Sequence, residues 1–330
     1  MRFLVFSSAL LLAGCATDLS GLEVLEGTGS DVEGKIFGGS PPNAEMHDAV
    51  VGLHTLSRGG RYVSGSPFCS GTLIADDIVL TAGHCLEGTS ASKVAIYVGD
   101  DPSVDLTSNL YAVSEVEVHP SYNSRTIRND IALMRLATPV IGVTPVPNLP
   151  TSEGLTIADI GVTVNFAGFG VDEHDNSGVK LQVDGTIDAA GCGVEGCPSA
   201  GDTATQFSYS QPHAGPCFGD SGGPAFIARD DVSYVAGITS YGDSDCAVYG
   251  VSTRVDAFDS YISAFMGTSS VDTGEPPVTG DCGNNICDEG ESCDGRDSTT
   301  SCSDDCAGKT GGKPSKRYCE VGSSCVGPAC

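Results

Sequence analysis

Residues 215–224 read GPCFGDSGGP, and this stretch decides the fold. It places four glycines and two prolines around a single serine, Ser221. Glycine and proline both disfavour the interior of helices and strands, so the composition predicts a turn. A turn of this kind holds the serine hydroxyl out, which raises the question of whether the chain also supplies the groups that make a hydroxyl reactive.

A serine hydroxyl is a weak nucleophile at neutral pH and needs a base, a carboxylate that orients the base, and donors for the charge on the substrate oxygen. His84 directly follows an apolar run in TLIADDIVLTAGHC, and Asp130 stands at the head of the apolar run in RNDIALMRL. The backbone N–H groups of Gly219 and Ser221 are candidate donors, because glycine lets the chain approach a ligand closely. The chain therefore contains every part of a nucleophilic site.

Three motifs together resemble those of the chymotrypsin/trypsin-like serine proteases. They are TAGHC at 81–85, NDIAL at 129–133 and GDSGGP at 219–224, in the family's order of histidine, aspartate and serine. The resemblance covers residues 36–266 and implies an all-β fold of two packed six-stranded antiparallel β-barrels with a C-terminal helix. It also implies catalysis by His84, Asp130 and Ser221, an oxyanion hole at the N–H groups of Gly219 and Ser221, and no cofactor.

The same resemblance implies that the protein is made as a zymogen. In GKIFGGS the cut would follow Lys35, and the new amino group of Ile36 would pair with the carboxylate of Asp220. Breaking a buried ammonium–carboxylate pair costs about 3–5 kcal/mol, so the pair can act as a switch. Phe37 replaces the valine of the family's pattern, a departure that bears on the fit of the N-terminal pocket.

The residue six before the nucleophile corresponds to the base of the primary substrate pocket, where trypsin-like members carry aspartate and this chain has Gly215. We therefore expect cleavage after uncharged, medium or large apolar side chains. Cleavage after Lys or Arg is the alternative, if Asp243 or Asp245 reaches the site from the rim. The resemblance assigns six residues to this pocket: Gly215, Pro216, Ser240, Tyr241, Gly242 and Gly250.

The N-terminus predicts export. Arg2 precedes an apolar run, residues 3–13, that is too short to span a bilayer. Residues 12–15, LAGC, resemble the lipobox of bacterial lipoproteins, which predicts a signal peptide over 1–14 and a lipid on Cys15. Ordinary signal cleavage after Ala16 is the alternative. We expect a bacterial cell-envelope lipoprotein, an extracellular protein after activation, or both in turn.

Residues 15–35 would form the pro-segment. An apolar pocket does not suit a cut after Lys35, so a separate trypsin-like protease is expected to activate the chain. Because the pro-segment has no cysteine besides Cys15, this cut would also separate the protease from its lipid anchor. A protease without zymogen control is the alternative, and it would be fully active with Lys35 still attached.

Composition narrows the partners. The formal net charge is -27, from 43 acidic and 16 basic residues, which makes nucleic acids and anionic lipid surfaces poor partners. Fifteen cysteines, with 44 glycines, indicate an oxidising compartment and a loop-rich structure. The expected partners are protein or peptide substrates and the activating protease, with membrane contact only through the N-terminal lipid.

Local patterns outline the domains. Residues 36–267 read as short apolar or alternating runs between turns, which predicts an antiparallel sandwich or barrel. Residues 268–281 read as a linker rich in Ser, Thr, Gly, Pro and acids, and residues 282–330 as a module with eight cysteines. Five apolar residues share a helical face before the linker: Val255, Phe258, Tyr261, Ile262 and Phe265.

The resemblance implies two disulfides, Cys69–Cys85 and Cys217–Cys246, while a small local loop is expected between Cys192 and Cys197. The module resembles cysteine-rich modules of bacterial surface and secreted proteins and has too little apolar material for a core, so disulfides must stabilise it. Zinc and calcium are the alternatives there, but the spacing lacks paired C-x-x-C units and an EF-hand pattern, so no metal is expected. Substrate docking, surface attachment and protection from proteolysis are all open roles for it.

A different class of function is a non-catalytic binding protein on a protease scaffold, with the cysteine-rich module carrying the activity. Labelling by a fluorophosphonate separates that class from an enzyme. The five histidines other than His84 are expected to be surface or core residues. Among them, His119 lies in HPSYN, which resembles a surface loop of the family, and His213 is expected near the pocket wall.

Overall fold

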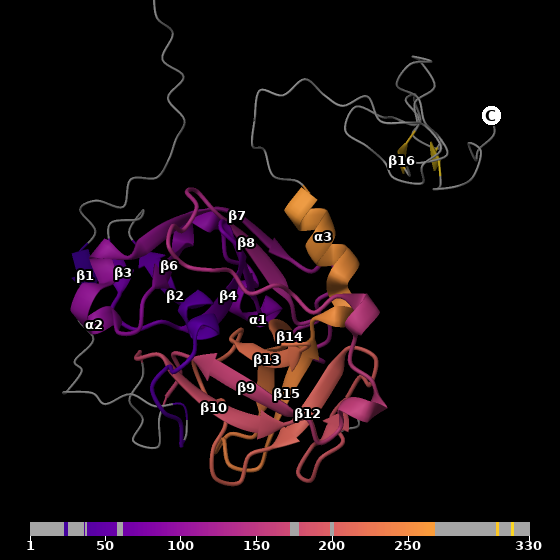
Figure 1. Cartoon of the computed structure of the whole chain (residues 1–330). Coiled ribbons are helices and arrows are strands. Elements are labelled where there is room, and N and C mark those ends of the chain that lie inside the picture. Colours follow the sequence, from indigo (N-terminus) through magenta and orange to yellow (C-terminus); the bar gives the residue numbers. More distant parts are fainter. Residues whose placement is uncertain are drawn as a thin grey trace, which may run out of the picture. The chain divides into compact units, whose positions relative to one another are not determined.

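A computed structural model of the chain describes residues 23–25, 36, 38–57, 62–171, 178–198, 201–267, 308–309 and 318–319. The chain divides into two units, Met1–Thr268 and Ser269–Cys330. In the first unit two sheets lie side by side (Figure 1). The predicted signal peptide, Cys15, Lys35, Phe37 and the linker lie outside the described residues.

The first sheet closes into a barrel. Its eight strands run in the order β1-β3-β2-β4-β5-β8-β7-β6, and an additional pairing of β2 with β6 closes a ring of six. Closure removes the exposed strand edges of the ring. The strands are β1 Glu23–Leu25, β2 Val50–Ser57, β3 Tyr62–Ser64, β4 Cys69–Ala75, β5 Ile78–Thr81, β6 Val94–Val98, β7 Leu110–Val118 and β8 Ala132–Leu136.

The second sheet has seven strands in the order β10-β9-β13-β14-β15-β12-β11, all antiparallel. Its ladder does not close within the described residues, because Gln182 on β10 forms an isolated bridge with Ser40 instead. The strands are β9 Thr163–Gly168, β10 Leu181–Thr186, β11 Ala189–Ala190, β12 Gln206–Ser210, β13 Pro224–Arg229, β14 Val232–Gly242 and β15 Tyr249–Arg254.

The predicted all-β fold class is confirmed, with one correction. The first barrel is closed and six-stranded, as expected, whereas the second is an open half-barrel. One hydrophobic core joins the two sheets, because Phe169, Phe226 and Ile238 of the second half pack in the same cluster as Leu53 and Leu133 of the first barrel. Side chains carried by the two sheets are therefore held at a close-packed boundary.

The predicted C-terminal helical face is confirmed. A short turn, η6 Asp256–Phe258, leads into α3 Asp259–Gly267, and Phe258, Ile262 and Phe265 are buried against the first barrel. Arg135 of β8 donates to the Phe265 carbonyl at 2.7 Å, which anchors the helix (Figure 1). The described part of the chain has no helix of the length and apolarity needed to cross a bilayer.

Short helices occupy the connections: η1 Glu45–Ala49, α1 Gly83–Leu86, η2 Ala91–Lys93, α2 Pro102–Asp105, η3 Leu106–Ser108, η4 Thr151–Glu153 and η5 Ile157–Asp159. In the second unit, β16 Gly308–Lys309 pairs antiparallel with β17 Tyr318–Cys319. The rest of the predicted cysteine-rich module lies outside the described residues.

Candidate active site

Strand pairing brings His84 and Asp130 together. β5 and β8 run antiparallel with Thr81 opposite Ala132, so the residues that follow Thr81 and those that precede Ala132 lie at the same end of the ladder. His84 sits on α1 directly after β5. Its Nδ1 lies 2.8 Å from Asp130 Oδ2, and its backbone N–H donates to Asp130 Oδ1 at 2.8 Å.

Asp130 is fully buried and accepts a further hydrogen bond from the Ser240 hydroxyl, at 2.5 Å to Oδ2. An acceptor-only carboxylate at this position keeps the proton of His84 on Nδ1. The other ring nitrogen then carries the lone pair. Sequence reasoning placed Ser240 in the pocket wall and missed this contact, because no local pattern links Ser240 to Asp130.

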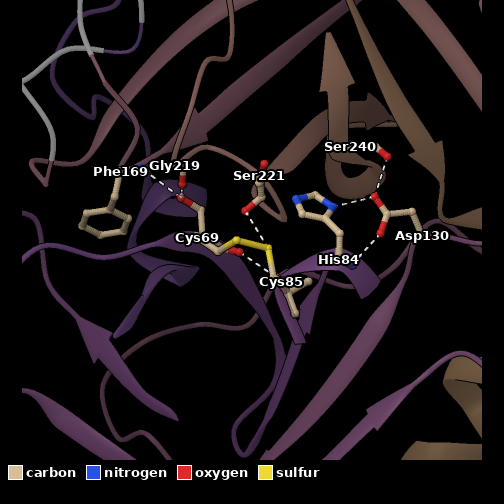
Figure 2. Close-up of a disulfide and its surroundings, with 10 residues drawn as sticks. Cys69, His84, Cys85, Asp130, Phe169, Gly219, Ser221 and Ser240 are labelled. Carbon is tan, nitrogen blue, oxygen red and sulfur yellow. Dashed lines mark hydrogen bonds and ion pairs between the residues drawn. A yellow bond between two sulfur atoms is a disulfide. The ribbon is translucent and has the colours of Figure 1, made fainter. Parts of the chain in front are cut away.

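Ser221 lies on the side of the imidazole opposite Asp130 (Figure 2). Its turn is tied to both sheets, since Ser70 N–H donates to the Ser221 carbonyl and Gly222 N–H donates to the Thr239 carbonyl, each at 2.8 Å. Gly222 has a φ of 83°, in the region that favours glycine. No hydrogen bond joins the Ser221 hydroxyl to His84 in the described structure, and nucleophile–base contacts are often loose before substrate binds.

Two backbone N–H groups at the serine turn are unpaired. Within the described part of the chain, neither Gly219 nor Ser221 donates its N–H to an acceptor, although Asp220 between them donates to the Cys217 carbonyl at 3.1 Å. Gly219 has a φ of 96°. Gly219 and Ser221 both line the cavity beside His84, so the two free donors are available to an oxygen that enters it.

Asp220 is a buried carboxylate without a cation. It accepts from Gly170 N–H at 2.8 Å and Cys217 N–H at 2.9 Å, and no described cationic group pairs with it. Burial raises the pKa of Asp220 to about 7, and the two backbone hydrogen bonds only partly oppose that rise. Ile36 is also fully buried.

Disulfides brace the loops that carry these residues. Cys69–Cys85 ties the residue after His84 to β4, and Cys217–Cys246 ties the serine turn to the loop after β14. A local bridge joins Cys192 to Cys197. Cys69, His84 and Cys85 place their ligand-type atoms close together, but both sulfurs are committed to a disulfide and are not free for a metal.

A cavity of about 720 Å³ lies beside His84 and Ser221. Of the pocket residues predicted from sequence, Pro216, Ser240, Tyr241, Gly242 and Gly250 line it, and Gly215 does not. The lining residues that sequence reasoning missed include Phe68, Tyr209, Gln211, Phe218 and Thr239. Phe218 lies inside the serine motif and is 63% exposed, so its position in GPCFGDSGGP was the signal that could have found it.

The rim aspartates serve the loop. Asp243 accepts the N–H groups of Asp245, Ala247, Val248 and Tyr249. Burial raises the pKa of Asp243, but these four hydrogen bonds outweigh burial and hold it below the ordinary value. The Asp243 carboxylate is therefore engaged in holding the loop.

The remaining site candidates lie elsewhere. Asp245 and His213 are exposed and are not among the residues that line the cavity. The ring of His119 packs edge-to-face on Phe258 and Tyr261, away from His84.

Residues 36–262 match the family model described as Trypsin. The chain belongs to the trypsin family. It is 29% identical to trypsin epsilon of Drosophila erecta over 264 residues, which cover 77% of this chain and 96% of that protein. It is 33% identical to a trypsin of Sarcophaga bullata over 111 residues, 34% of this chain and 41% of the relative. The protein is therefore a serine endopeptidase of the trypsin family, and the geometry above is its candidate active site.

Proposed function

We propose that this protease cuts peptide bonds through an acyl-enzyme on Ser221, with His84 as the base and Asp130 as the group that orients it. The observation that carries the proposal is the placement of His84, its buried carboxylate and two unpaired N–H groups around one cavity that also contains Ser221.

In the proposed mechanism His84 Nε2 takes the proton of the Ser221 hydroxyl as the oxygen attacks the substrate carbonyl. The imidazolium is stabilised by the buried carboxylate of Asp130, 2.8 Å away. The oxyanion receives hydrogen bonds from the N–H groups of Gly219 and Ser221, which have no other described acceptor. His84 then gives its proton to the leaving amine, and water releases the acyl group by the same steps in reverse.

Activation is proposed to follow cleavage between Lys35 and Ile36. The uncut chain leaves the Asp220 carboxylate buried without a cation, and the cut would create an ammonium group at Ile36 that supplies one. The segment after Ile36 already packs on the loop that leads into the serine turn, since a Cβ on Gly38 would lie 2.7 Å from the His213 carbonyl oxygen. Ordering that segment would therefore be felt at the pocket.

The proposed specificity is for uncharged, medium or large apolar residues before the cut bond. Gly215 provides no carboxylate, and the Asp243 carboxylate is engaged by loop N–H groups. A protease with this pocket would need a separate trypsin-like enzyme to cut after Lys35. Efficient cutting by the protein at its own Lys35 would contradict the proposal.

We also propose that a lipid on Cys15 anchors the uncut protein and that activation releases it. After the cut, the pro-segment would be held to the protease only by the pairing of β1 with β3, residues 23–25 against 62–64. So short a pairing is a weak hold. The two relatives named above come from flies and add no support for a bacterial lipoprotein, so the test is direct: protein that begins at Ile36 should leave the membrane fraction, and its retention there would contradict release.

The proposed function is tested with the full chain cut after Lys35, a peptide library and a Ser221→Ala control. Cleavage after apolar residues that is absent from the control supports the mechanism and the pocket together. Cleavage after Lys or Arg keeps the mechanism and overturns the specificity. A fluorophosphonate that fails to label Ser221 overturns the mechanism.

A further inference from the structure

The space expected for a side chain at the base of the pocket is filled by a different residue. A Cβ on Gly215 would lie 2.5 Å from Oε1, 2.7 Å from Cβ and 2.9 Å from Cδ of Gln211. Gln211 lines the cavity and Gly215 does not. The amide of Gln211 therefore stands where a side chain of residue 215 would point.

Hydrogen bonding fixes the orientation of this amide. Gln211 follows β12, and its backbone N–H donates to the Val248 carbonyl at 3.1 Å, which continues the pairing of β12 with β15. Its Nε2 donates to the Pro216 carbonyl at 3.3 Å. A carbonyl can only accept, so the nitrogen faces Pro216 and the oxygen faces the side of Gly215.

The oxygen of this amide has no partner. Gln211 is 2% exposed, and its Oε1 is buried without a hydrogen bond among the described residues. Most buried polar atoms in proteins are satisfied, so an exception beside a substrate cavity points to a ligand that completes it. The atom requires a donor, because an amide oxygen can only accept.

The surroundings of the amide are neutral. Tyr209 also lines the cavity and covers the side-chain side of Gly250, where an added Cβ would lie 2.6 Å from the tyrosine hydroxyl. Among the described lining residues, the charged carboxylate is that of Asp243, whose oxygens are engaged by loop N–H groups. A buried cation at the floor would meet no counter-charge there, which disfavours Lys and Arg.

We propose that Gln211 forms the floor of the primary pocket and selects substrates whose residue before the cut bond is uncharged and ends in a hydrogen-bond donor. This inference rests on the proposed proteolytic function and narrows its substrate class. Among uncharged side chains of one size, those with a donor at the tip satisfy Gln211 Oε1, and those without one leave it buried and unpaired.

Matched peptides test the inference with the full chain cut after Lys35. Two pairs differ in little besides the donor: tyrosine against phenylalanine, and glutamine against methionine, each before the cut bond. Fluorophosphonate labelling of Ser221 counts active sites, so kcat/KM is expressed per folded site. We expect the donor-tipped member of each pair to be cut roughly two- to tenfold faster.

Two variants of the floor complete the test. Gln211→Met keeps the shape and removes the acceptor, so both ratios should fall to about one. Gln211→Glu keeps the shape and adds a carboxylate, so cleavage after Lys and Arg should rise at least about tenfold relative to the apolar peptides. Asp245→Asn removes an exposed rim charge and should leave both ratios as they are.

The outcomes separate the inference from the function. Ratios near one in the unaltered protein, or ratios that Gln211→Met leaves unchanged, overturn the role of Gln211 while proteolysis stands. If Gln211→Met is not labelled, a failure of Gln211→Glu to gain cleavage after basic residues overturns it in the same way. Absence of any cleavage and of Ser221 labelling in the unaltered protein overturns the proposed function and this inference with it.

Discussion

Replacing Asp220 by asparagine in the uncut chain should make its stability less sensitive to pH. The carboxyl has a pKa of 3.8 in the absence of burial and about 7 in the fold, because burial disfavours its charged form. Between these values the folded chain holds a proton that the unfolded chain has lost. The free energy of unfolding should therefore fall as pH rises from about 4 to about 7, by about 4 kcal/mol for this group.

Asp220→Asn removes that dependence and has a cost of its own. The asparagine oxygen can accept only one of the two N–H groups, from Gly170 and Cys217, and its amide nitrogen opposes the other. An unsatisfied buried donor costs about 1–3 kcal/mol. We expect the variant to be less stable than the parent near pH 4 and more stable, by about 1–3 kcal/mol, at pH 8.

The assay is urea unfolding followed by circular dichroism at several pH values from 4 to 8. Lys35→Gln and Ser221→Ala in both proteins keep the chain uncut, and Asp231→Asn measures the effect of losing one exposed negative charge. A difference between parent and variant that is independent of pH would refute the reasoning. After a cut at Lys35 the sign at pH 8 should reverse, since the variant then lacks the proposed pair with Ile36, which costs about 3–5 kcal/mol to break.

Three further substitutions test the site and its supports. Asp130→Asn should lower kcat by about 10⁴ in steady-state peptide assays, because an amide no longer keeps the proton of the base on the correct nitrogen, and a loss below tenfold would contradict this role. Gly222→Ala should cost at least about 3 kcal/mol in urea unfolding, since φ is 83° and the added Cβ would collide with a backbone carbonyl and a threonine hydroxyl, whereas Gly267→Ala meets nothing within 4 Å and should be near neutral. Replacing Cys69 and Cys85 by serine opens a loop with a separation of 16 residues and should cost about 3 kcal/mol by the same measurement, and an unchanged midpoint would contradict it.

Features that depend on neighbours along the chain were predictable from sequence. The turn at Ser221 follows from its glycines and prolines, and the buried face of α3 follows from the helical spacing of Phe258, Ile262 and Phe265. His84 and Asp130 were recognisable because each adjoins an apolar run that forms a barrel strand.

Features that depend on contacts between distant segments were not predictable. Ser240 donates to Asp130 across a separation of 110 residues, and no periodicity records that contact. The second sheet stays open because β10 pairs with Ser40, from the start of the protease domain. Gln211 was missed because its side chain reaches the pocket by passing over Gly215, and the sequence shows only that Gly215 carries no charge.

The sequence by itself determined the fold class, the order of the reactive residues and the absence of an aspartate at position 215, because each depends on residue type and local pattern. Only the tertiary structure decided which group forms the pocket floor and that Asp220 lacks a cation in the uncut chain. The physical reason is that burial, hydrogen-bond partners and pKa are set by whatever fills the space around a group. In this protein that space is filled by loops and strands remote from it in the chain.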